Sequence, residues 1–193
     1  REEAVSACAS LLTSNDIVVS TTGMISRELY EYRDSVNQSH EMDFLTVGSM
    51  GHASQIALGI ALEKKDRTVV CFDGDGAVLM HAGSLAIVGS VSPNNYLHIV
   101  FNNGAHDSVG GQPTVGFEVS IPEIAKACGY KNIFSVSTIS DFEKAFNICR
   151  NNGTSLIEFR VKKGSRKDLG RPKTLPIENK NSFLRFLNNT KNE

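Results

Sequence analysis

The sequence predicts an α/β fold, a three-layer open parallel sheet with helices on both faces. Six short apolar runs, typical of strands buried on both faces, alternate with stretches of helical length. No internal repeat or low-complexity segment interrupts this alternation. The 193 residues suit one domain, so we expect a single domain over 1–193.

The elements are expected in a regular order along the chain. The strands, each an apolar run, are expected at 17–19, 44–47, 68–72, 97–101, 133–136 and 155–161. The helices are expected between them, at 2–12, 23–32, 52–63, 77–89, 121–128 and 140–151. Ser140 precedes Asp141 and Glu143, a pattern typical of a helix start. A basic segment at 162–176 breaks the alternation, and we expect it to be an ordered excursion before a short helix at 181–187.

Charge and cysteine usage exclude several classes of function. Twenty basic and 21 acidic residues give a net charge of -1, so we expect neither a nucleic acid nor a membrane as partner. No apolar run approaches the roughly 18 residues of a membrane helix. The four cysteines are widely spaced without a Cys-x-x-Cys pair, which favours buried thiols in a reducing cytoplasm over disulfides or zinc.

Two polar loops follow neighbouring expected strands. Asp75 lies in a Gly-Asp-Gly tripeptide, and Asn102 follows 27 residues later at the start of Asn-Asn-Gly. Strand ends in an open α/β sheet meet at the crevice where such folds bind ligands. A carboxylate, an amide and a backbone carbonyl suit Mg²⁺, which completes its octahedron with phosphate oxygens and water. The sequence therefore predicts a site for Mg²⁺ and a diphosphate, with glycines that permit close approach of the backbone.

This spacing resembles the signature of the thiamine-diphosphate-dependent enzymes. The resemblance implies that Asp75, Asn102 and the backbone carbonyl of Gly104 hold Mg²⁺. It also implies cofactor contacts from neighbouring residues of the two loops, namely Gly74, Gly76, Ala77 and Ala105. The alternative for the tripeptide alone is an ordinary turn with a solvated Asp. A Rossmann fingerprint is excluded because 74–79 lacks its third glycine.

A second motif, 47–53, precedes the apolar stretch 56–62. It resembles the family segment that grips the aminopyrimidine ring, which implies cofactor contacts from Gly48, Ser49 and Met50. The Gly48 carbonyl would accept from the exocyclic amine, and the adaptable Met50 side chain would bend the cofactor. A plain core methionine is the alternative. Thr22, between a strand and a helix, is expected either to bind a diphosphate oxygen or to cap the helix.

Two further segments, 103–114 and 163–172, are similar to phosphonopyruvate decarboxylases. This resemblance implies decarboxylation of 3-phosphonopyruvate to phosphonoacetaldehyde and CO₂, with the cofactor as electron sink. The substrate carries two anionic groups, for which Arg166 and Arg171 are the candidate partners. A solvated basic loop is the alternative for both. The related sulfopyruvate decarboxylases, whose catalytic domain can be a separate subunit, offer a second substrate.

His52 and His106 flank the expected site and are the candidate catalytic residues, because imidazole exchanges protons near neutral pH. A structural hydrogen bond is the alternative role for each.

In this family a pyrimidine-binding domain supplies a glutamate that activates the cofactor, and no segment here resembles that domain. We therefore expect it from a preceding N-terminal domain or a separate subunit. The active enzyme is then expected to be an oligomer, with a homo-oligomer favoured, and the isolated chain to be inactive.

Two other classes of function remain as alternatives. A 2-oxoacid oxidoreductase would bind the same cofactor and pass electrons to an iron–sulfur cluster, but four scattered cysteines supply no cluster pattern. A binding module could keep the fold without activity, although the presence of Asp75, Asn102 and Met50 argues against such decay.

Overall fold

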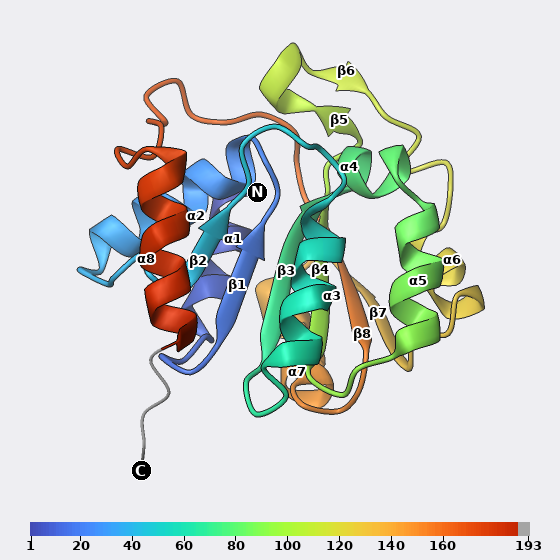
Figure 1. Ribbon diagram of the computed structural model, residues 1–193. Coiled ribbons are helices and arrows are strands. Elements are labelled where there is room, and N and C mark those ends of the chain that lie inside the picture. The colour runs from blue at the N-terminus through green and yellow to red at the C-terminus, as the bar shows by residue number, and fades with distance from the viewer. Residues whose placement is uncertain (189–193) are drawn as a thin grey trace.

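The structure, a computed structural model, describes residues 1–188 and is built on one six-stranded parallel sheet (Figure 1). In spatial order the strands are β2 (Asp43–Leu45), β1 (Ile17–Ser20), β3 (Val69–Gly74), β4 (Tyr96–Asn102), β8 (Ser155–Arg160) and β7 (Asn132–Val136). Every neighbouring pair is parallel, so all carboxyl ends lie at one edge of the sheet. The predicted fold class is confirmed.

Helices cover both faces of the sheet. One face is covered by α1 (Glu2–Ser10), α2 (Met24–Ser35) and α7 (Ile139–Cys149). The other is covered by α3 (Ala53–Glu63), α5 (Gly83–Val91), α6 (Ile121–Ala127) and α8 (Pro176–Asn188). Among the described residues, no helix has both the length and the apolar character needed to cross a membrane.

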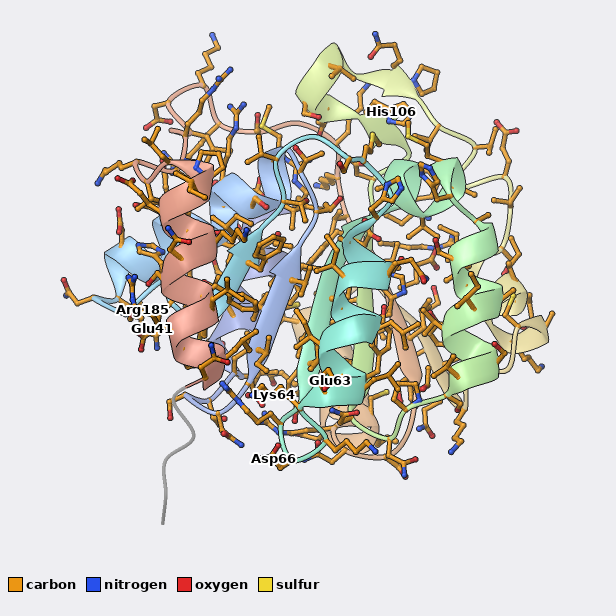
Figure 2. All side chains as sticks on the ribbon, viewed as in Figure 1. Glu41, Glu63, Lys64, Asp66, His106 and Arg185 are labelled. Carbon is orange, nitrogen blue, oxygen red and sulfur yellow. The ribbon has the colours of Figure 1, made fainter. Side chains whose placement is uncertain are left out.

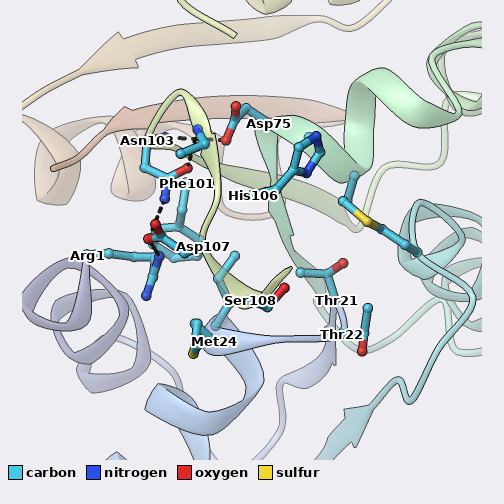
Figure 3. A pocket seen from close by; sticks show the side chains of 16 residues that line it. Arg1, Thr21, Thr22, Met24, Asp75, Phe101, Asn103, His106, Asp107 and Ser108 are labelled. Atoms are coloured by element: carbon cyan, nitrogen blue, oxygen red, sulfur yellow. Dashed lines mark hydrogen bonds and ion pairs between the residues drawn. The ribbon is translucent and has the colours of Figure 1, made fainter. Parts of the chain in front are cut away.

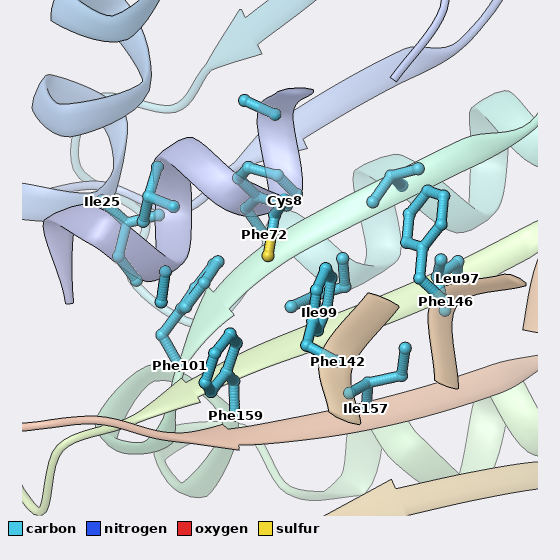
Figure 4. Packing of buried hydrophobic residues seen from close by; sticks show 14 of the residues in the cluster. Cys8, Ile25, Phe72, Leu97, Ile99, Phe101, Phe142, Phe146, Ile157 and Phe159 are labelled. Carbon is cyan, nitrogen blue, oxygen red and sulfur yellow. The ribbon is translucent and has the colours of Figure 1, made fainter. Parts of the chain in front are cut away.

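Successive strand residues feed the two hydrophobic layers alternately, because side chains on a strand point to opposite faces. In β3, Phe72 packs toward the layer of α1, α2 and α7, whereas Cys71 packs toward the other layer. Figure 4 shows the first layer, where the Phe72 and Phe101 rings meet edge to face at 5.4 Å between centroids. Phe142 of α7 stacks on Phe159 of β8 at 5.2 Å. This packing fixes the ends of β3, β4 and β8 relative to one another.

Several element boundaries differ from the prediction. The helix expected at 77–89 is two helices, α4 (Asp75–Met80) and α5, separated at His81 and Ala82. They are separate because α4 lies over the strand ends while α5 packs on a face of the sheet (Figure 1).

Three further boundaries were wrong. The strand expected at 44–47 ends at Leu45, because Val47 is exposed and Gly48 adopts a φ of 72°. The cap of α7 is Thr138 rather than Ser140, and its side chain accepts a hydrogen bond from the amide of Asp141. The helix expected at 181–187 starts earlier, at Pro176.

A small hairpin lies over the carboxyl edge of the sheet and was not predicted. It consists of β5 (Ala105–His106), a 3-10 turn η1 (Asp107–Val109) and β6 (Gln112–Pro113), with β5 and β6 antiparallel. The basic segment 162–175 runs along the same edge from β8 to α8 (Figure 1). Figure 2 places His106 of the hairpin at this edge, while Glu63, Lys64 and Asp66 lie at the opposite end of the molecule. The hairpin and the basic segment therefore both lie over the carboxyl ends of the strands.

Gly89 is required for close packing between α5 and the end of α6. A Cβ atom added there would lie 1.9 Å from the backbone oxygen of Cys128. We expect Gly89→Ala to lower the free energy of unfolding by about 1–3 kcal/mol, measured by denaturant titration, because overpacked backbone must move apart. Gly59→Ala in α3 meets nothing within 4 Å and serves as the control. Equal unfolding midpoints for the two variants would contradict this prediction.

Candidate active site at the carboxyl edge

Asp75 and Asn102 lie side by side at the carboxyl edge. Asp75 is the first residue of α4, directly after β3, and Asn102 is the last residue of the neighbouring β4. Both are buried, with exposed fractions of 1% and 0%. The backbone amide of Gly104 donates to Asn102 Oδ1 at 3.2 Å, and that of Asn103 donates to Asp75 Oδ1 at 3.3 Å. The structure thus brings together the three residues expected to hold Mg²⁺.

The segment after the hairpin, 114–116, crosses these three residues. The Thr114 hydroxyl donates to Asp75 Oδ2, and the Thr114 amide donates to the Gly104 carbonyl at 2.9 Å. Asn102 Nδ2 donates to the carbonyl of Gly116 at 2.6 Å. Sequence reasoning missed Thr114 and Gly116 as site residues. The local pattern of apolar residues does not indicate that this segment folds back onto Asp75 and Asn102.

The oxygens of Asp75 and Asn102 converge on one point beside Gly116. A Cβ atom added to Gly116 would lie 2.5 Å from Asp75 Oδ2 and 2.7 Å from Asn102 Oδ1. A carboxylate and an amide oxygen within reach of one small volume are the hard ligands that Mg²⁺ prefers. The donor set therefore fits this cation.

Burial sets the electrostatics of Asp75. Loss of solvent raises the pKa of its carboxyl, because the charged form is poorly solvated there. Hydrogen bonds from the Thr114 hydroxyl and from the backbone amides of Asn103, Asp75 and Gly76 oppose this rise in pKa. The site thus carries a desolvated carboxylate that a cation would stabilise.

A cavity opens beside Asp75 between the strand ends, the start of α2 and the hairpin (Figure 3). Six of the residues expected to contact the cofactor line it besides Asp75: Thr22, Met50, Gly74, Gly76, Ala77 and Ala105. Thr22 does not cap α2, whose N-cap residue is Gly23. His106 also lines the cavity, with its ring against Gly76, where a Cβ atom would lie 2.4 Å from His106 Cε1.

The loop 47–52 brings only Met50 to the cavity. Gly48 and Ser49 are exposed, and both adopt positive φ, 72° and 47°. His52 is exposed as well, and its Nδ1 lies 3.2 Å from the carbonyl of Ser49. Its ring packs against His81 at 4.3 Å between centroids. Of the two candidate histidines, His106 is therefore the one at the cavity.

A buried charge network anchors the hairpin on α2. The Arg1 guanidinium pairs with Glu28 at 2.8 Å and with Asp107 of the hairpin. Asp107 Oδ2 also accepts from Asn103 Nδ2 and from the Gly164 amide, each at 2.8 Å. Burial raises the pKa of Glu28, and the hydrogen bond and charge of Arg1 oppose that rise in pKa. The hairpin, the Asn103 loop and the basic segment are thereby tied together at one carboxylate.

The two arginines expected to meet the substrate lie outside the cavity lining. Arg166 pairs with three carboxylates, those of Glu2, Glu31 and Asp168. The pairs with Glu2 and Glu31 hold the basic segment against α1 and α2, whereas Asp168 lies within the segment itself. Arg171 is exposed. A role for Arg166 in binding an anion would require it to leave these partners.

Comparison with known proteins identifies the domain. Residues 21–159 match the family "Thiamine pyrophosphate enzyme, C-terminal TPP binding domain". The chain belongs to this family. Its match spans the strands and loops that carry Thr22, Asp75, Asn102 and Glu158.

Two relatives with known names are decarboxylases. The chain is 43% identical over 171 residues to the phosphonopyruvate decarboxylase of Streptomyces viridochromogenes, which covers 88% of this chain and 42% of that protein. It is 42% identical over 132 residues to the sulfopyruvate decarboxylase subunit beta of Methanocaldococcus jannaschii, with 68% of this chain and 66% of that subunit covered. The chain thus spans about two fifths of the phosphonopyruvate decarboxylase that it matches.

Solved structures show the same fold at low sequence identity. The benzoylformate decarboxylase from Polynucleobacter necessarius superposes with a TM-score of 0.72 at 18% identity, covering 86% of this chain and 33% of that one. The six-stranded sheet with helices on both faces is therefore the fold of this thiamine-pyrophosphate-binding domain.

Proposed function

We propose that this chain supplies the diphosphate- and metal-binding half of a thiamine-diphosphate-dependent decarboxylase acting on 3-phosphonopyruvate. The observation that carries the proposal is the 43% identity over 88% of the chain to a phosphonopyruvate decarboxylase. The convergence of Asp75 and Asn102 oxygens at one buried point supports it, because carboxylate and amide oxygens are the ligands that Mg²⁺ prefers. The alternative substrate is sulfopyruvate, given 42% identity to a sulfopyruvate decarboxylase subunit.

In this proposal each part of the site has one task. Asp75, Asn102 and the Gly104 carbonyl would hold Mg²⁺, which would neutralise negative charge of the diphosphate. Thr22, Gly74, Gly76, Ala77 and Ala105 contact the diphosphate end of the cofactor, and Gly48, Ser49 and Met50 contact its pyrimidine end. When bound, the cofactor supplies the electron sink for loss of CO₂. Among the histidines, His106 is placed at the cavity and is proposed to move the proton, with His52 the weaker candidate.

The other half of the active site is proposed to come from a pyrimidine-binding domain, preceding this one or on a separate subunit. The relative from Methanocaldococcus jannaschii is itself named a subunit beta, which supports the second arrangement. We therefore expect the chain alone to release no CO₂ and the assembled enzyme to be an oligomer.

The test is CO₂ release by the complete enzyme, this chain together with its pyrimidine-binding half, supplied with thiamine diphosphate and Mg²⁺. Turnover of phosphonopyruvate in preference to sulfopyruvate is the expected result. The reverse preference would move the proposal to sulfopyruvate decarboxylation. Absence of turnover on both, with cofactor bound, would overturn decarboxylation of these substrates and leave the cofactor site standing.

Substrate recognition by the basic segment is proposed for Arg171, because Arg166 is engaged by three carboxylates. We expect Arg171→Ala to raise the substrate KM about 10-fold or more while kcat changes less, since a charge-assisted contact of about 1.5–3 kcal/mol is lost. Lys173→Ala, which removes another cation of the same segment, is the matched control. An unchanged KM in both Arg166→Ala and Arg171→Ala would refute a substrate contact from this segment.

A further inference from the structure

Glu158 is a buried carboxylate at the carboxyl edge. It lies in β8, a strand that is otherwise apolar over 156–159, and its exposed fraction is 0%. Burying a carboxylate is costly unless hydrogen bonds and opposite charge compensate it. Packing alone does not account for a buried carboxylate at this position, next to the candidate site.

The contacts of Glu158 lead to Asn102. Its Oε1 accepts a hydrogen bond from Asn102 Nδ2 at 2.7 Å. Its Oε2 accepts from the Ser135 hydroxyl and from Arg160 Nε, the latter at 3.1 Å. Ser135 and Arg160 therefore hold one oxygen of the carboxylate while the other is presented to Asn102.

The Asn102 carboxamide is fixed in one orientation by these contacts. Its Nδ2 donates both to Glu158 and to the Gly116 carbonyl, so both amide hydrogens are used. Its Oδ1 accepts from the Gly104 amide at 3.2 Å and lies on the side of Asp75. A primary amide can turn either its NH₂ donor or its oxygen acceptor toward Asp75. A hydrogen-bond acceptor on the opposite side holds the NH₂ group, so the oxygen faces Asp75.

We propose that Glu158 is a positioning residue for the metal site: it holds the Asn102 carboxamide so that Oδ1, not Nδ2, faces the divalent cation. The inference rests on the proposed function, since it assigns Asn102 to the cation. A carboxylate accepting from the amide nitrogen also draws electron density toward the amide oxygen, which strengthens a ligand to a cation. Glu158 itself does not touch the cation.

The experiment measures Mn²⁺ binding to the complete enzyme with thiamine diphosphate, by the loss of the free Mn²⁺ electron-paramagnetic-resonance signal. Glu158→Leu removes the acceptor and is expected to weaken Mn²⁺ binding by about 10–100-fold, the usual effect of losing an outer partner of a metal ligand. Glu158→Gln keeps an oxygen that can accept from Asn102 and is expected to bind with intermediate affinity. Ser135→Ala perturbs the same carboxylate but leaves its contact with Asn102. Of the three variants, it should therefore lose the least Mn²⁺ affinity.

A second measurement separates positioning from general damage. At saturating Mn²⁺ the turnover of Glu158→Leu should recover toward the wild-type value, because the cation compensates for a misoriented ligand but does not repair a damaged fold. Affinity of Glu158→Leu equal to the wild-type value would overturn the inference. If Glu158→Leu does not fold, Glu158→Ala, which also removes the acceptor for Asn102 Nδ2, takes its place, and Mn²⁺ affinity of Glu158→Ala equal to the wild-type value overturns the inference. Failure of the wild-type enzyme to bind Mn²⁺ would instead overturn the proposed function.

Discussion

Asp75→Ala is expected to abolish Mg²⁺-dependent binding of thiamine diphosphate. The substitution removes the carboxylate proposed as a ligand, at the point where the oxygens of Asp75 and Asn102 converge. Loss of an outer hydrogen-bond partner of a metal ligand typically costs 10–100-fold in affinity, so loss of the ligand itself should exceed roughly 100-fold. Calorimetric titration of the complete enzyme with the cofactor, at fixed Mg²⁺, measures this change.

The same substitution should leave the free energy of unfolding without cofactor unchanged or raised. Burial raises the pKa of the Asp75 carboxyl, so at neutral pH its charged form opposes folding. Loss of binding together with an undiminished unfolding midpoint distinguishes a ligand from a structural residue. Asp66→Ala, at the opposite end of the molecule (Figure 2), is the control. Wild-type cofactor affinity in Asp75→Ala would refute the assignment of this metal site.

Gly116→Ala is expected to weaken cation binding almost as strongly. The added methyl carbon would lie 2.5 Å from Asp75 Oδ2 and 2.7 Å from Asn102 Oδ1, the two oxygens that converge on the expected cation. The backbone of the segment must retreat, and the 2.6 Å hydrogen bond from Asn102 Nδ2 to the Gly116 carbonyl lengthens or breaks. We expect Mn²⁺ affinity to fall by at least about 10-fold, again measured by the electron-paramagnetic-resonance signal of the free ion.

Gly83→Ala is the matched control for this effect, because an added Cβ meets nothing within 4 Å there. Gly116→Val extends the series, since a larger side chain should weaken the affinity further. Retention of wild-type Mn²⁺ affinity by both Gly116 variants would show that the space between the two oxygens is not used by the cation.

Much of the site's framework was predictable because it depends on strand order and spacing. Asp75 and Asn102 follow consecutive buried strands, and parallel neighbours place their ends together. The division between α4 and α5 was missed because neither Gly nor Pro marks a break at His81 and Ala82. The break arises from tertiary packing, since α4 and α5 lie on different parts of the sheet.

The contributions of Thr114, Gly116 and Glu158 were not predictable from local patterns. Thr114 and Gly116 reach Asp75 and Asn102 because the hairpin folds back over the strand ends. Glu158 was the one visible signal, a carboxylate inside an apolar strand, although its partner Asn102 belongs to a different strand. Periodicity describes one element at a time, whereas these contacts join elements far apart in the sequence.

The contact between Asn102 and Glu158 spans 56 residues and joins β4 to β8, the last strand in the described part of the chain. A ribosome adding about 5–20 residues per second needs roughly 3–11 s to synthesise that interval. During this time β4 has one neighbour, β3, and the second neighbour, β8, does not yet exist. Until β8 is made, the side of β4 that pairs with β8 stays unpaired and Asn102 lacks its acceptor on Glu158, so this part of the site can form only after that strand has been synthesised.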